Sequence, residues 1–171
     1  MRRKDRALSK ETAIQILKDG EYGILATCGE DRQPYGVPLS YVYHDGRIYF
    51  HGAKTGHKLN NLSCSPKVSF TVVGHTHVLQ EAFSTAYRSA IAFGEVFPVE
   101  EAHQAEALML LAEKYCYDNL TNAERYIQKM LGHVGVYCME VQHLTGKVKP
   151  EMIKQPHYDR SAVIVWLTCI Y

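Results

Sequence analysis

The chain has 171 residues and a mass of 19.4 kDa, which is the size of one ordinary domain. It holds 46% hydrophobic and 22% charged residues, a globular composition that excludes disorder, collagen and coiled coil. Nineteen Lys and Arg against eighteen Asp and Glu give a net charge of +1, so we do not expect a nucleic-acid binder, which gathers positive charge against phosphates.

The sequence carries no signal for a membrane or an export pathway. Its longest apolar runs, at 107–112 and 162–167, are far shorter than the roughly 20 residues that cross a bilayer. The charged N-terminus is not followed by the apolar stretch of a signal peptide. Five cysteines without a Cys-x-x-Cys pair predict neither a disulfide framework nor a zinc ribbon. We therefore expect a cytoplasmic protein without membrane association.

The first third of the chain predicts a short helix followed by strands. Ser9 is placed to cap the helix, and Asp19-Gly20 is placed to end it. Three β-prone segments follow, at 22–27, 35–43 and 47–52. Asp45-Gly46 predicts a hairpin between the last two, because this pair accepts the positive φ angles of a tight turn.

The middle of the chain continues with one helix and two strands. A short helix is expected over residues 58–63, before Pro66. Alternating apolar residues over 68–72 predict a strand, and His75-Thr76-His77 is expected in a loop. Residues 84–97 are expected to form the next strand.

Two helices and a last strand complete the prediction. Apolar residues at helical spacing predict a helix that begins just after Pro98. Thr121 and Glu124 form a capping box for a second helix, which Gly132 ends, and residues 134–141 are the last strand. Six strands joined mostly by short turns favour an antiparallel barrel or sandwich with helices outside it over a parallel sheet.

Residues 49–58 run from a strand through a glycine-bearing turn into a helix start, where a phosphate would fit. Backbone N–H groups at a helix N-terminus attract anions, and Thr55, His57 and Lys58 can complete the cradle. Leu59 stands where a Walker A loop has Ser or Thr, so a nucleoside triphosphatase is not expected. The stretch equally fits a solvated surface loop.

Two further features each have a functional and a structural interpretation. Pro38 lies inside the 35–43 strand and indicates a sheet edge or a bulge. Backbone groups freed there can bind a heterocycle, or the proline simply protects the edge. The nine histidines show no ligand spacing, so no metal site is expected and structural or solvated roles are favoured.

Several segments carry a family resemblance over roughly the first 150 residues. They are residues 1–6, 36–43, 48–53 with 56–58, 66–70, 87–94 and 144–147. Together they resemble the flavin-binding split-barrel proteins related to pyridoxamine 5'-phosphate oxidase, and among these the 5-nitroimidazole resistance group. The resemblance implies a mainly β domain over residues 1–150, a six-stranded antiparallel split β-barrel with peripheral helices. The tail over 151–171 matches nothing assignable.

The resemblance also implies a homodimer that binds FMN in two clefts between its subunits. The residues that it brings to the cofactor form four groups: Pro38, Leu39 and Ser40 along the isoalloxazine; His51, Gly52 and Ala53 along the ribityl chain; His57 and Lys58 at the phosphate; and Arg88 and Ser89 from the other subunit. Glycine suits a close backbone approach, and lysine suits a dianionic phosphate.

By the same resemblance, the expected reaction is reduction of a small flat acceptor, including nitroimidazoles, by the flavin. His51 is the candidate for proton delivery, because its strand face is opposite that of Ile48 and Phe50 and imidazole titrates near neutrality. Beyond the flavin loop, the sequence shows no cluster of Lys, Arg and His residues that would hold a second phosphate. Pyridoxamine phosphate is therefore not the expected substrate. Two alternatives stay open: a haem-binding protein with His51, His57 or His75 as axial ligand, and a flavin-binding module without turnover.

Overall fold

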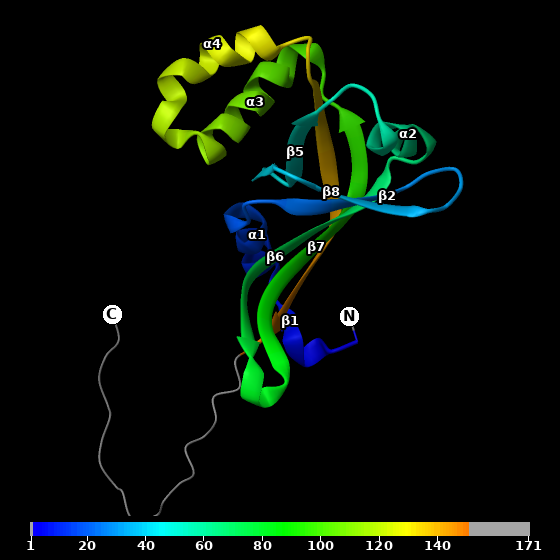
Figure 1. Cartoon of the computed structure of the whole chain (residues 1–171), viewed down its shortest axis with the longest axis vertical. Helices are drawn as coiled ribbons and strands as arrows, with labels where there is room; N and C mark the ends of the chain where they lie inside the picture. The colour runs from blue at the N-terminus through cyan, green and yellow to red at the C-terminus, as the bar shows by residue number, and fades with distance from the viewer. Residues whose placement is uncertain (1, 151–171) are drawn as a thin grey trace, which may run out of the picture.

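An antiparallel sheet forms the body of the computed structural model, which describes residues 2–150 (Figure 1). Its strands are β1 (Ala7–Leu8), β2 (Gly23–Cys28), β3 (Pro34–Leu39), β4 (Val42–His44), β5 (Arg47–Gly52), β6 (Lys67–Leu79), β7 (Ser84–Pro98) and β8 (Gly135–Lys149). Their order is β3-β2-β6-β7-β8-β5-β4, and β1 pairs with β8. Because only two residues separate β3 from β4, the two edges of the sheet meet there and the sheet forms an open barrel.

Four helices accompany the sheet within residues 2–150. They are α1 (Lys10–Asp19), α2 (His57–Cys64), α3 (Glu101–Tyr115) and α4 (Leu120–Met130), with 3₁₀ turns at Lys4–Arg6, Gln80–Ala82 and Tyr117–Asn119. Figure 1 shows α3 and α4 together at one end of the molecule, while the β6–β7 hairpin reaches the other end. None of the helices in this part of the chain is long and apolar enough to cross a membrane. The tail expected over 151–171 lies outside the described residues.

Two hydrophobic cores hold these elements together. The larger one fills the barrel and includes Leu17 of α1, Phe50 of β5 and Phe70 of β6, all with no exposed surface. The smaller one joins α3 to α4 and to β8 through residues such as Leu111 and Ile127. The strands present alternate side chains to the barrel core, as the period of two requires. The helical pair therefore has a core of its own beside the barrel.

The single strand expected over residues 35–43 is instead two strands, β3 and β4. Val37, Leu39 and Tyr43, at odd-numbered positions of the segment, pack against the barrel core. The strand breaks at Tyr41 because its N–H donates a 2.9 Å hydrogen bond to the hydroxyl of Tyr115 on α3 rather than to a neighbouring strand. With the two-residue β1, this break gives eight strands in place of the expected six, and the mainly β antiparallel class is confirmed.

Strands β6 and β8 are longer than the sequence predicts. β6 continues through His75-Thr76-His77, which was expected to be a loop, and β8 extends to Lys149. Both pair with the 15-residue β7, with irregular register between Val73 and Thr76 on β6 and near Phe93 on β7. A long neighbouring strand supplies hydrogen-bond partners to a segment that contains Gly74 and lacks apolar alternation, so pairing overrides the local pattern.

One of the two predicted N-terminal helix caps is confirmed. The Ser9 hydroxyl accepts a 3.2 Å hydrogen bond from the Thr12 N–H at the start of α1. The capping box at Thr121 is wrong, because α4 begins at Leu120 and Asn119 precedes it without a side-chain cap. A 3₁₀ turn runs directly into α4 and places Thr121 inside its first turn.

Tyr41 connects α1 to the barrel core. Its buried hydroxyl donates a 2.6 Å hydrogen bond to the Leu17 carbonyl, in the last turn of α1, where carbonyls lack helical partners. We expect Tyr41→Phe to lower the free energy of unfolding by about 1–3 kcal/mol, because it leaves a buried carbonyl unsatisfied. Urea unfolding followed by circular dichroism measures this. Tyr22→Phe, at a side chain that is 63% exposed, is the control and should change nothing. Equal stability of the Tyr41 variant and the wild type would contradict the assignment.

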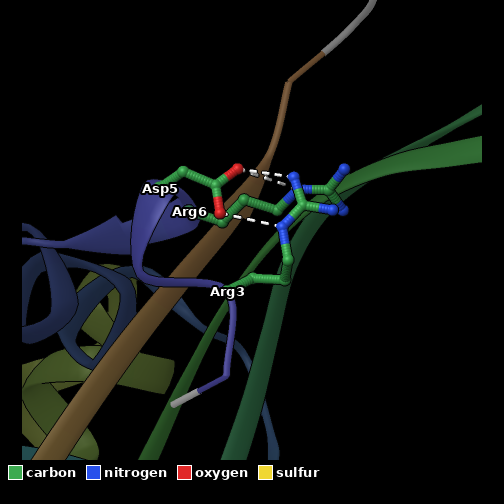
Figure 2. Close-up of polar contacts among 3 residues, drawn as sticks. All are labelled: Arg3, Asp5 and Arg6. Atoms are coloured by element: carbon green, nitrogen blue, oxygen red, sulfur yellow. Dashed lines mark hydrogen bonds and ion pairs between the residues drawn. The ribbon is translucent and has the colours of Figure 1, made fainter.

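The N-terminal 3₁₀ turn carries a small charged cluster (Figure 2). Arg3 donates hydrogen bonds of 2.8 and 2.5 Å to the carboxylate of Asp5, and Arg6 Nε lies 4.0 Å from the same carboxylate. The hydrogen bond from Arg3 is the main cause that lowers the pKa of Asp5 to about 2. Because ion pairs between exposed side chains contribute little to global stability, the cluster orders the turn before β1 rather than the whole fold.

Candidate functional site

The segment that joins β5 to α2 forms an anion-binding geometry. β5 ends at Gly52, and α2 begins at His57 after Gly56, whose φ of +120° suits glycine alone. No side chain caps the N-terminus of α2. The first N–H groups of a helix have no partners within the helix, and the positive end of the helix dipole lies there. This backbone arrangement can accept a phosphate.

Lys58 places a cation at the same position. A Cβ added to Gly52 would lie 2.9 Å from the Nζ atom of Lys58, so the ammonium group rests directly against the glycine backbone. The Nζ atom also lies 5.2 Å from the ring centre of Phe50 and 5.9 Å from that of Tyr137. Partial burial lowers the pKa of Lys58, because a charge shielded from water is less stable than a hydrated one. A half-buried ammonium beside an uncapped helix start can pair with an anion such as a phosphate.

His57 lies on a different side of α2 from Lys58. Its ring stacks on Tyr35 of β3, with centroids 4.4 Å apart and an interplanar angle of 16°. It also lines a separate surface cavity together with Asn60 and Cys64. The structure therefore does not bring the His57 and Lys58 side chains to one point. Thr55 and Ala53 are exposed in the connecting turn.

Ser40, in the break between β3 and β4, and His51, on β5, line the same cavity. The cavity has a volume of about 430 Å³ and lies under α3 and α4. The strand face predicted for His51 is confirmed, because Ile48 and Phe50 are fully buried on the opposite face. Partial burial, and then the charge of Lys58, lower the pKa of His51 below its ordinary value. The shift favours the neutral form of the imidazole.

Pro38 and Leu39 lie on β3, the edge strand beside β2. Pro38 is exposed and is opposite Ile24 in the register, in agreement with the edge that the proline predicts. The side chain of Leu39 packs against the barrel core. The backbone of Leu39, rather than its side chain, is therefore the part that a ligand could contact.

Arg88 and Ser89 do not join this group within one chain. They lie on β7, opposite Val148 and Lys147 of β8. Ser89 lines another surface cavity on the outer face of the sheet, not the cavity that contains Ser40 and His51.

The outer face of the sheet carries an exposed apolar patch that the sequence analysis did not identify. Ile24 on β2, Val73 on β6 and Phe93 on β7 are 41%, 55% and 45% exposed on neighbouring strands. The register places Ile24 opposite Thr71 and Thr71 opposite Ile91, so the patch crosses three strands. Apolar residues at both odd and even positions of β7 are the sequence signal for two covered faces.

The helical side of the cavity was also missed. α3 supplies Leu108 and Tyr115, and α4 supplies Tyr126 and Ile127. Their helical spacing predicts packing surfaces but does not indicate which strands they contact, so the cavity follows only from the tertiary structure.

A family model described as pyridoxamine 5'-phosphate oxidase matches residues 9–148. An uncharacterised protein of Rhizobium meliloti (strain 1021) is 25% identical over 150 residues, which are 83% of this chain and 93% of that protein. The family model spans β2 to β8, apart from the last residue of β8, and includes the loop with Lys58 and the helices α3 and α4.

Solved structures share the fold. A candidate 5-nitroimidazole antibiotic resistance protein from Bacteroides thetaiotaomicron has a TM-score of 0.69 and 21% identity, over 83% of this chain and 86% of that one. The FAD and haem binding protein from Mycobacterium smegmatis has a TM-score of 0.60 and 18% identity, over 82% and 71%. The expected split-barrel class is thus confirmed, with eight strands. Since the family model matches residues 9–148, which are most of the chain, the chain belongs to the pyridoxamine 5'-phosphate oxidase family.

Proposed function

We propose that the protein binds FMN and uses it to reduce small flat acceptors, with 5-nitroimidazoles as candidate substrates. One observation carries the proposal: the half-buried ammonium of Lys58 rests against Gly52 beside the uncapped start of α2. Membership of the family supports it, as do the names of the two solved structures, one concerned with nitroimidazole resistance and one with FAD and haem.

The residues of this chain would hold the cofactor in three ways. Lys58 and the first N–H groups of α2 would bind the phosphate through charge-assisted hydrogen bonds. The backbone at Gly52 and Ala53 would follow the ribityl chain. The exposed edge from Pro38 to Ser40 would follow the ring, with Leu39 contributing backbone groups because its side chain is buried in the core.

Bound FMN, once reduced by a hydride donor such as a reduced nicotinamide nucleotide, supplies two electrons. Conversion of a nitro group to a nitroso group takes these two electrons and two protons and releases one water. His51 lies at the cavity wall beside Ser40, where its imidazolium form can give one proton to an acceptor oxygen. The reduced flavin would supply the other proton together with the two electrons, as a hydride equivalent.

We expect His51→Gln to lower turnover of 2-methyl-5-nitroimidazole about 100-fold while FMN still binds, because a positioned acid contributes at least that much. The pKa of His51 is lowered, so the acid form is a minority at pH 7 and grows as the pH falls. Wild-type turnover should therefore rise toward acid pH, and that of the variant should not. His44→Gln, at an exposed histidine of β4 outside this cavity, is the control. Unchanged turnover of the His51 variant would remove the assignment.

We further propose that the protein is a homodimer with a cofactor cleft at each side of the interface. The apolar patch of Ile24, Val73 and Phe93 supports this, because a soluble monomer rarely exposes such a surface on the central strands of its sheet. In the dimer, Arg88 and Ser89 of the second copy would reach the flavin. This would account for their distance from Ser40 and His51 within one chain.

The decisive test of cofactor identity is the absorption spectrum of the purified protein, with the released chromophore identified by mass spectrometry. We expect flavin bands and the mass of FMN. A Soret band would instead favour the haem alternative, with His51, His57 or His75 as the axial ligand. Bound FMN without consumption of any acceptor would indicate a flavin-binding module. A colourless protein that takes up no added FMN would contradict the proposal.

A further inference from the structure

The cavity under α3 and α4 has walls of an unusual composition for a surface hollow. Leu108 and Leu111 of α3 and Ile127 of α4 form its apolar wall and are each less than 10% exposed. Among the described residues that line it, none is Asp, Glu, Lys or Arg. Apart from the imidazolium form of His51, the walls offer a charged ligand no ion pair in exchange for the hydration that it would lose, and that loss is costly. The wall therefore selects an uncharged ligand.

Aromatic and amide side chains stand around this apolar wall. Tyr115 and Tyr126 are 37% and 64% exposed and offer ring faces for stacking. Asn119 and Asn122 offer amide groups that can bond to polar substituents. A volume of about 430 Å³ lies within the range of small-molecule sites and accommodates a compound of one to three rings.

The helical side of the cavity is fixed to the barrel by the end of α3. The Tyr115 hydroxyl accepts a hydrogen bond from the Tyr41 N–H at 2.9 Å and lies 2.5 Å from the Glu21 carbonyl, to which it donates. The neighbouring Lys114 donates a 2.7 Å hydrogen bond to the Gly20 carbonyl, and its Nζ lies 4.0 Å from the ring centre of Tyr41. These contacts hold the wall in place next to Ser40, so the cavity is preformed.

We propose that this cavity binds the electron acceptor, an uncharged aromatic compound of one to three rings, with its reducible group directed at Ser40 and His51. The inference rests on the proposed function, because Ser40 and His51 are the residues that the cavity shares with the proposed flavin site. It assigns acceptor selection to α3 and α4, whereas the barrel holds the cofactor.

The test uses the purified full chain freed of flavin, with N-phenyl-1-naphthylamine as an uncharged fluorescent aromatic probe. We expect saturable binding to the wild type and at least 10-fold weaker binding to Ala112→Phe, which fills the cavity from α3. Ala102→Phe makes the same change at an exposed position of that helix outside the cavity and should bind like the wild type. Equal binding by both variants would overturn the inference.

A second variant provides a test in case Ala112→Phe does not fold. Tyr126→Ala removes an exposed ring, so it should leave the circular dichroism spectrum and melting temperature unchanged and weaken probe binding about 3- to 10-fold. Wild-type affinity for the probe in this folded variant would also count against the cavity.

FMN titrations of the same proteins separate the two proposals. If the wild type and Ala112→Phe bind FMN equally and only the variant loses the probe, the result supports both the flavin site and the acceptor cavity. If the wild type binds no FMN while probe binding still depends on position 112, the flavin proposal fails and the aromatic site stands. If saturating FMN expels the probe completely, the flavin itself fills the cavity and the acceptor inference is wrong.

Discussion

Lys58→Ala should weaken FMN binding about 10- to 100-fold, because a hydrogen bond to a charged group contributes about 1.5–3 kcal/mol. The Lys58 ammonium lies against the Gly52 backbone and is partly shielded from water, so a phosphate there would meet a preformed, poorly screened charge. Quenching of flavin fluorescence on titration with the flavin-free protein measures the affinity.

Two controls isolate the phosphate contact. Riboflavin, which lacks the phosphate, should bind the variant and the wild type with the same affinity. Lys54→Ala changes an exposed lysine of the same turn, whose ammonium bonds to the Gly132 carbonyl, and should leave FMN binding unchanged. If Lys58→Ala bound FMN as tightly as the wild type, the phosphate site at α2 would be wrong. If Lys58→Ala lost affinity for FMN and riboflavin alike, Lys58 would act on the structure of the loop and not through contact with the phosphate.

The same variant tests the coupling between Lys58 and His51. The charge of Lys58 contributes to the lowered pKa of His51, after burial, so Lys58→Ala should raise that pKa toward its ordinary value. An NMR titration of the imidazole C–H signal in the flavin-free protein measures the change, with Lys54→Ala as the reference. A bound phosphate, which neutralises Lys58, should act in the same direction. An unchanged pKa would show that burial alone sets it.

Phe93→Asp should convert the proposed homodimer into a monomer. Phe93 lies on the outer face of β7 between Ser69 of β6 and His143 of β8, at the middle of the sheet. An aspartate there would be buried without a partner in the interface, a cost that typically abolishes association. Light scattering should show half the wild-type mass. FMN affinity should fall more than 10-fold, because Arg88 and Ser89 of the second copy are withdrawn.

A matched substitution outside the patch distinguishes disruption of the interface from a general effect of added surface charge. Tyr117→Asp introduces the same charge at a ring that is 68% exposed between α3 and α4, and should leave the mass unchanged. Because Phe93 is 45% exposed in the single chain, its variant should keep the wild-type circular dichroism spectrum. A wild-type monomer that still binds FMN would refute the shared cleft, and a dimeric Phe93→Asp would refute this face as the interface.

Features governed by a few neighbouring residues could be predicted from the sequence. Ser9 caps α1, and Asp45 and Gly46 adopt φ angles of 44° and 79° in the predicted hairpin. Pro38 lies on an edge strand, and His51 faces away from the buried Ile48 and Phe50. Each follows from side-chain chemistry at one position or from the period of two of a strand, so distant residues are not needed to decide it.

The same reasoning failed where an adjoining turn or a distant element changed the local structure. Thr121 does not cap α4, because the preceding 3₁₀ turn starts the helix earlier. His75–His77 belong to β6, because β7 is long enough to pair with them. The break at Tyr41 depends on a hydroxyl 74 residues away, which no local pattern indicates.

By itself, the sequence determined the mainly β class, the family resemblance and the loop with Lys58, because local spacing and motifs carry all three. The tertiary structure alone decided that Ser40 and His51 share a cavity with α3 and α4, that His57 and Lys58 diverge, and that Ile24, Val73 and Phe93 form one patch. These depend on which strands become neighbours and on which helix covers them. Such long-range pairings are set by packing of the whole barrel, whereas sequence spacing reports only on residues a few positions apart.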